Sequence, residues 1–143
     1  MSDFRKLSDT MLASPQISLD DIAEAKAVGV TLIVNNRPDG EDPSAPQGDE
    51  IAAAAEAAGL SYVAIPIGHS GFSEPQVDAL IAALEANTGA TLGYCRSGTR
   101  STLLWALAQA KLGTSPDTIA AAAAQAGYDI SPVRAMVDML AAR

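Results

Sequence analysis

The sequence predicts an α/β fold with a central, mostly parallel sheet, flanking helices, and extra helices at the C-terminal end. Apolar runs of strand length alternate with helical segments through roughly the first hundred residues, which is typical of a parallel sheet. Two more helical segments, each opening with Ser-Pro, follow without a strand between them, so we expect them to cover one face. The 143 residues can bury one ordinary core, which predicts a single domain over residues 1–143.

The elements have local reasons in the sequence. Ser18 is a good N-cap with Asp21 at the capping-box spacing, and Gly29 can end the helix that begins there. Ser73 caps a helix with one apolar stripe, and β-branched runs predict buried strands. In chain order we expect an edge hairpin over 4–8 and 10–14, a helix over 18–29, a strand over 30–36, a helix over 49–59, a buried strand over 60–67, a helix over 74–87, a strand over 90–94, and helices over 101–113, 115–127 and 131–143.

Composition excludes several classes of protein. The net charge of −8 and a pI of about 4.4 argue against nucleic acid or an anionic membrane as a partner. One cysteine and one histidine exclude an internal disulfide and a zinc site of standard spacing, and we expect no metal and no cofactor. The sequence has neither a secretory h-region nor an apolar run of membrane-spanning length, which predicts a soluble cytoplasmic protein.

The only cysteine, Cys95, stands between the predicted strand over 90–94 and the helix that follows it. At such junctions the first turn of the helix offers unpaired N–H groups and a partial positive charge, which bind anions and favour a thiolate. Arg96 and Arg100 add two formal charges, and the small residues between them let the loop curl with its N–H groups inward: Ser97, Gly98 and Thr99. This context predicts a nucleophile, whereas the plainer interpretation is a small buried apolar residue.

The loop "YCRSGTRS" resembles the active-site loop of cysteine-dependent phosphatases and rhodaneses. Together with "NNRPDGE", "AAAAEAAGLSYVAIPI" and "RSTLLWALA", it makes the chain similar, over roughly residues 4–110, to the phosphatase-like domain of the beta-lactamase-hydrolase-like family. The resemblance implies a protein-tyrosine-phosphatase-like fold. Domains of this family also occur fused to sulfide- and persulfide-oxidising enzymes, which implies sulfur chemistry for some members.

The spacing in the loop separates phosphate from sulfur chemistry. Tyrosine phosphatases have the pattern Cys-x5-Arg, but here Ser101 holds the sixth position and Arg100 comes one residue earlier, as in rhodaneses. A phosphoryl group needs a ring of N–H donors wide enough for three oxygens and a bidentate arginine. We expect the shorter loop to form a tighter ring, which better suits the single terminal sulfur of a persulfide.

The residues around the loop leave two roles open. The segment "PIGHSGFSEP" lacks the aspartate that protonates a leaving alkoxide in dual-specificity phosphatases; it offers His69 and Glu74 instead. His69 is either a proton donor in the pocket or a solvent-exposed loop residue. Arg37 is either a third cation for the anion or a turn arginine paired with Asp39 or Glu41.

These observations predict a cysteine-dependent sulfurtransferase, in which the Cys95 thiolate takes sulfur from thiosulfate or glutathione persulfide and passes it to a thiol acceptor such as glutathione. This hypothesis requires a thiol that solvent can reach. A persulfide-oxidising enzyme is an expected partner, and Cys95, Arg100 and His69 are the expected catalytic residues. The expected substrate-binding residues are Arg96, Ser97, Gly98, Thr99, Ser101 and Arg37. The alternatives are a phosphatase with a phosphocysteine intermediate and an inactive anion-binding regulatory module.

Overall fold

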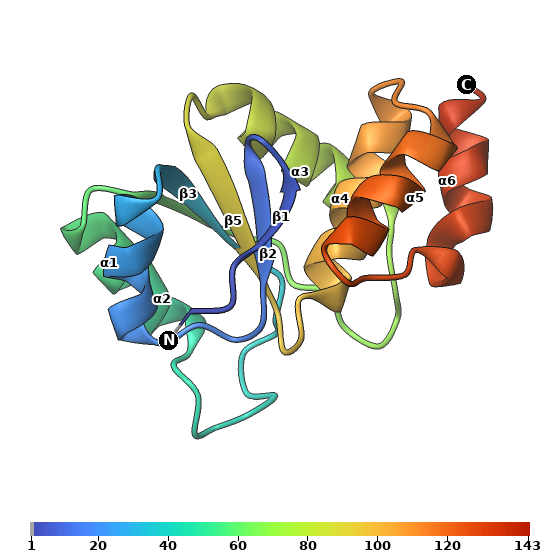
Figure 1. Ribbon diagram of the computed structural model, residues 1–143. Helices are drawn as coiled ribbons and strands as arrows, with labels where there is room; N and C mark the ends of the chain where they lie inside the picture. The colour runs from blue at the N-terminus through green and yellow to red at the C-terminus, as the bar shows by residue number, and fades with distance from the viewer. Residues whose placement is uncertain (1) are drawn as a thin grey trace.

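The computed structural model describes residues 2–143, which form a five-stranded sheet with helices on both faces (Figure 1). The strand order is β1-β2-β5-β3-β4; β1 and β2 pair antiparallel, and the other neighbours pair parallel. The strands are β1 (Arg5–Ser8), β2 (Met11–Ser14), β3 (Val30–Asn35), β4 (Ser61–Ala64) and β5 (Ala90–Tyr94). The mostly parallel sheet that the sequence predicts is therefore confirmed.

The helices divide between the two faces of the sheet. On one face, α1 and α2 bury Ile22 and Ile51 against β3 and β5. On the other face, α3 and α4 pack on the sheet, and α5 and α6 cover the outer side of α4 (Figure 1). The helices are α1 (Leu19–Ala27), α2 (Gly48–Ala57), α3 (Glu74–Ala86), α4 (Thr99–Lys111), α5 (Pro116–Gln125) and α6 (Arg134–Ala141), with a short 3₁₀ helix, η1, over Ser131–Val133.

Local sequence signals behave as expected at the helix ends. The hydroxyl of Ser18 accepts a hydrogen bond from the Asp21 N–H, and the Asp21 carboxylate accepts one from the Ser18 N–H. Gly29 follows α1 with a φ of 98°, which a residue with a side chain rarely adopts. The capping box and the stop signal were therefore both predicted correctly.

The structure corrects two expectations about strands. The N-terminal hairpin forms, but of its two strands only β1 is an edge strand, because β2 pairs in parallel with the central strand β5. The strand expected over 60–67 covers only Ser61–Ala64 and is an edge strand with partly exposed side chains rather than a buried one. Pro66 has no N–H to continue a ladder, although the Ile65 N–H still donates to the carbonyl of Asn35, the last residue of β3, and the Ile67 N–H donates to that of Asn36.

The parallel arrangement brings the carboxyl ends of β2, β5, β3 and β4 to one edge of the sheet. Loops that follow these strands therefore meet there, and such edges are where open α/β sheets bind ligands.

Among residues 2–143, no helix has the length and apolar character needed to cross a lipid bilayer.

Candidate active site

Cys95 lies directly after the central strand β5, and three residues later Gly98 serves as the N-cap of α4. The segment after β2 holds the loop on one side: the Cys95 N–H lies 3.4 Å from the Ser14 carbonyl oxygen, and Gln16 N–H donates to the Arg96 carbonyl at 3.2 Å. The sequence placed Cys95 at a strand-to-helix junction, and the structure puts it in the middle of the sheet edge.

The loop closes over the thiol. The Gly98 N–H donates to Cys95 Sγ at 3.1 Å, and the Gly98 carbonyl accepts from the Thr102 hydroxyl at 2.9 Å. Cys95 is 0% exposed, while Arg96 and Ser97 are at the surface. The solvent-accessible thiol that the sulfurtransferase hypothesis requires is thus absent from this conformation, because the six-residue loop leaves no opening above the sulfur.

Glu41 binds the two arginines that were expected to hold a substrate anion. Both terminal nitrogens of Arg100 donate to its carboxylate, at 2.7 and 2.9 Å, and Arg100 also donates to the Ile67 carbonyl at 2.8 Å. The Arg37 Nε donates to the same carboxylate at 2.9 Å, and its Nη1 donates to Gln16 at 3.0 Å. Arg37 is therefore paired with Glu41, as expected for a turn arginine. It also lies beside Arg100, as expected for a third cation at the site.

The hydrogen bonds from Arg100, with those from Arg37, hold the pKa of Glu41 at about 2, against an ordinary value of 4.5, although partial burial opposes the shift. The pKa of Arg100 is raised, first by its hydrogen bond to Glu41 and further by the charge of Cys95. The site therefore holds an ionised carboxylate between two cations near neutral pH.

An open cavity of about 310 Å³ lies above this ion pair. His69 is exposed and lines the cavity, so the structure places it beside the arginines while its side chain remains open to solvent. Glu74 is bound instead to Lys111 and Arg143, on the side of α3 that faces α4 and the C-terminus. The lining residues are Arg37, Glu41, Gly68, His69, Arg96 and Arg100.

The remaining expected site residues divide into two groups. The Ser97 hydroxyl donates to Thr99 Oγ1 at 2.9 Å; Ser97 is exposed, and Thr99 is partly exposed. Ser101 is 1% exposed, and its hydroxyl donates to Asn36 Oδ1 at 2.7 Å, so it does not line the cavity. Ser101 instead connects α4 to Asn36, directly after β3, through this hydrogen bond.

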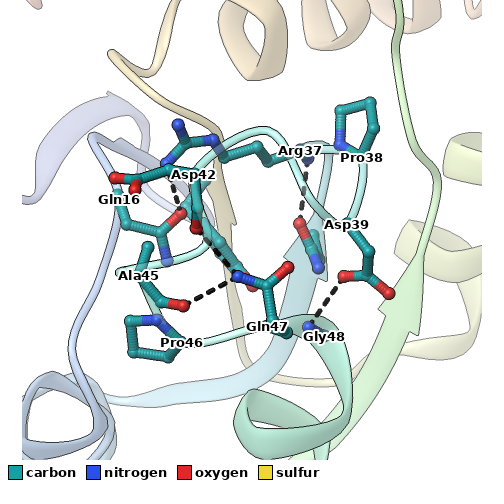
Figure 2. Close-up of a pocket in the computed structure, with 11 residues that line it drawn as sticks. Gln16, Arg37, Pro38, Asp39, Asp42, Ala45, Pro46, Gln47 and Gly48 are labelled. Carbon is teal, nitrogen blue, oxygen red and sulfur yellow. Dashed lines mark hydrogen bonds between the residues drawn. The ribbon is translucent and has the colours of Figure 1, made fainter.

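A second, much smaller pocket of about 10 Å³ lies under the loop over residues 37–48 (Figure 2). Figure 2 shows the Asp39 carboxylate directed at the Gly48 N–H, 2.9 Å away, and the Gln47 amide directed at the Ala45 carbonyl. The buried hydroxyl of Tyr94 reaches this pocket and has no hydrogen-bond partner within residues 2–143, and burial raises its pKa. Arg37 lines both pockets, so this loop also fixes one wall of the larger cavity.

Three residues of the site were not identified from the sequence. The sequence indicated Glu41 only as a possible ion-pair partner of Arg37. Its position in "RPDGE", directly after a strand that ends at the binding edge of the sheet, could have indicated a site residue. Asn36 is 2% exposed and donates to the Ile65 carbonyl at 2.9 Å. The Tyr128 hydroxyl donates to the Ser97 carbonyl of the loop, but this residue comes from beyond α5, and no local pattern connects it to the loop.

Replacing Glu41 with glutamine is expected to lower the free energy of unfolding by roughly 1 kcal/mol at neutral pH, because an amide has no charge to pair with Arg100 and Arg37. The pKa of Glu41 is lowered on folding, so its stabilisation is present above pH 4.5 and is lost as the pH falls toward 2. Urea unfolding of both proteins across this range should show the two free energies converging at acid pH. A difference that stays constant with pH would contradict the ion-pair explanation.

The chain resembles known proteins over most of its length. A sequence model described as "Beta-lactamase hydrolase-like protein, phosphatase-like domain" matches residues 3–112. The beta-lactamase hydrolase-like protein of Xylella fastidiosa (strain Temecula1) is 34% identical to this chain over 103 residues, and that of Agrobacterium fabrum is 30% identical over 105 residues. The matches cover 72% and 73% of this chain but 24% of each relative, so the chain spans about a quarter of their length.

Solved structures share the fold. A candidate phosphatase from Neisseria meningitidis Z2491 has a TM-score of 0.85 and 28% identity, with 98% of this chain and 99% of that one covered. The active form of Tk-PTP has a TM-score of 0.77 and 17% identity, with 99% and 97% covered. The second likeness is one of fold alone, and it confirms the predicted phosphatase-like architecture.

Proposed function

Because the chain belongs to the phosphatase-like domain family of the beta-lactamase hydrolase-like proteins, we propose that it is a cysteine-dependent phosphatase. In the proposed reaction Cys95 Sγ forms a bond to phosphorus while the bond from phosphorus to the alcohol or phenol oxygen breaks. Water then cleaves the S–P bond, releasing phosphate and restoring the thiolate. His69, at the cavity wall, is the candidate proton donor to the leaving oxygen.

One observation carries this proposal: Cys95 sits between the central strand and the N-terminus of α4, with the Gly98 N–H directed at its sulfur. The helix N-terminus favours negative charge at the sulfur and at a bound phosphoryl group. The Neisseria protein, which shares 28% identity over nearly the whole chain, supports phosphatase chemistry over the sulfurtransferase reaction that we expected first.

Turnover requires two movements of the closed site. The loop has to open, because Cys95 is fully buried. Arg100 has to exchange the Glu41 carboxylate for the oxygens of the phosphoryl group, which present the same bidentate acceptor geometry. A phosphate ester is thus expected to compete with an internal anion for the same guanidinium.

The test is hydrolysis of p-nitrophenyl phosphate by the wild type and by Cys95→Ser. Wild-type turnover with loss of at least about a thousandfold in the variant supports the proposal, since removing an activated nucleophile removes most of the rate enhancement. Arg134→Ala is a matched control: it removes an arginine of α6 that pairs with Asp117 and Asp138 and does not line the cavity, so it should retain most of the activity. Wild-type protein without phosphatase activity would overturn the proposal.

A specific observation keeps sulfur transfer as the second candidate. Four residues separate Cys95 from Arg100, one fewer than in tyrosine phosphatases, and the 3.1 Å contact from Gly98 N–H to Sγ leaves little room for a phosphoryl group. The reactants would be a small anionic sulfane-sulfur donor and a thiol acceptor such as glutathione, with a persulfide-oxidising enzyme as a partner. A mass gain of one sulfur atom on Cys95 after incubation with thiosulfate, together with slow phosphate release, would favour it.

Alkylation by iodoacetamide at mildly acidic pH distinguishes both enzymes from an inactive anion-binding module. An activated thiol reacts quickly under these conditions, whereas an ordinary thiol is nearly inert. Cys95 that stays unmodified, in a protein with no turnover of either substrate, would leave the inactive module as the explanation.

A further inference from the structure

The peptide that joins Ser97 and Gly98 is hydrogen-bonded at both of its ends. Its N–H donates to Cys95 Sγ at 3.1 Å, and its carbonyl oxygen accepts from the Tyr128 hydroxyl at 3.1 Å. Both groups belong to one planar amide, so the hydroxyl and the sulfur lie at opposite ends of a single rigid unit. A side chain from beyond α5 is thereby connected to the candidate nucleophile through one peptide.

Tyr128 is itself fixed in place. It is 8% exposed, and its N–H donates to the Ala123 carbonyl at the end of α5 at 2.9 Å. The Arg5 guanidinium of β1 lies 5.1 Å from the centre of its ring. The aromatic ring also approaches Gly98 so closely that a methyl group there would overlap the tyrosine hydroxyl.

We propose that Tyr128 is a positioning residue for the Cys95 thiolate, acting through the Ser97–Gly98 peptide. A hydrogen bond to the carbonyl oxygen fixes the plane of the amide and polarises it, which makes its N–H a stronger donor to the sulfur. A tyrosine hydroxyl is protonated at neutral pH and so is available as a donor, and burial raises the pKa of Tyr128 further from that range.

Other charged groups surround this arrangement. From α4, Arg100 interacts electrostatically with Cys95, and from β1, Arg5 lies over the Tyr128 ring and is paired with Asp3. None of them contacts the Ser97–Gly98 peptide by a hydrogen bond within residues 2–143. The inference rests on Cys95 being the working thiol of the proposed function, and Tyr128 lies beyond the family match over residues 3–112.

The test compares wild type and Tyr128→Phe, which keeps the ring over Gly98 and removes only the hydroxyl. Thiolate absorbance in the ultraviolet is followed across pH, with each protein measured against its Cys95→Ala counterpart to cancel tyrosine absorbance. The midpoint of thiolate formation should move upward by roughly 0.3 pH units, since polarisation strengthens the N–H···S bond by only a fraction of its free energy. At a pH below the midpoint, the thiolate fraction should fall about 2-fold.

Tyr62→Phe is the matched control, because it removes a tyrosine hydroxyl that bonds to Asn35 rather than to the loop. Its midpoint should coincide with that of the wild type. An unchanged midpoint in Tyr128→Phe, or an equal shift in both variants, would overturn the inference. A shift in a protein without phosphatase activity would support the positioning role and reject the proposed function, so the two can fail separately.

Discussion

Replacing Gly98 with alanine is expected to lower the free energy of unfolding by roughly 3 kcal/mol and to disrupt the Cys95 loop. Two costs add. Gly98 has a φ of 90°, in the left-handed region that residues with a side chain rarely adopt. An added methyl carbon would also come within 2.1 Å of the Tyr128 hydroxyl oxygen and 3.2 Å of the Ser14 carbonyl carbon. Denaturant unfolding measures the loss, and the Cys95 alkylation rate reports the change in the loop.

Gly113→Ala provides the matched control. Gly113 lies at the other end of α4 with a φ of 102° and has no atom within 4 Å of an added methyl carbon. It should therefore show the backbone strain without the overlap, a loss of roughly 1 kcal/mol, with an unchanged alkylation rate. Equal destabilisation by the two substitutions would contradict the close packing of Tyr128 on Gly98.

Replacing Asn36 with alanine is expected to lower the free energy of unfolding by roughly 3 kcal/mol, the cost of leaving two buried polar groups unpaired. Its side chain donates to the Ile65 carbonyl at 2.9 Å and accepts from the Ser101 hydroxyl at 2.7 Å. Its N–H also donates to the Tyr94 carbonyl at 2.9 Å, directly before Cys95. One residue thus connects the chain after β3 to the ends of β4 and β5 and to α4.

Ser101→Ala separates the contributions of the two side-chain hydrogen bonds. It removes the donor to Asn36 while the bond from Asn36 to the Ile65 carbonyl stays, so the loss should be about 1 kcal/mol. Chemical denaturation at neutral pH measures all three proteins. If Ser101→Ala lowers the free energy of unfolding as much as Asn36→Ala does, the hydrogen bond from Asn36 to the Ile65 carbonyl contributes nothing. Asn36 would then not join the end of β4 to the site.

Features that depend on neighbouring residues could be predicted from the sequence. The capping box at Ser18 and the position of Cys95 between a strand and a helix both follow from signals within a few residues. The apolar run that follows the loop, which includes Leu104 and Trp105, is buried in the core. Family resemblance added the phosphatase-like architecture, which the comparisons confirm.

What the sequence could not supply depends on contacts between distant segments. The place of β2 beside β5 is a pairing between residues about 80 positions apart, which no local propensity encodes. Glu41 reaches Arg100 across 59 positions, and Tyr128 reaches Ser97 across 31. The burial of Cys95 depends on these same distant contacts as well as on the short spacing of the motif, so the spacing alone could not predict it.

Helix α4 is enclosed on nearly every side, by the sheet on one and by α5 and α6 on the other. The outer helices contribute Ile119, Val137 and Leu140 to the same apolar cluster as Leu107, although they lie beyond the residues that the family model matches. The cooperative unit of unfolding is therefore longer than the recognisable motif region. A truncation at residue 112 would strip the apolar outer side of α4 and favour aggregation, even with every cavity-lining residue retained.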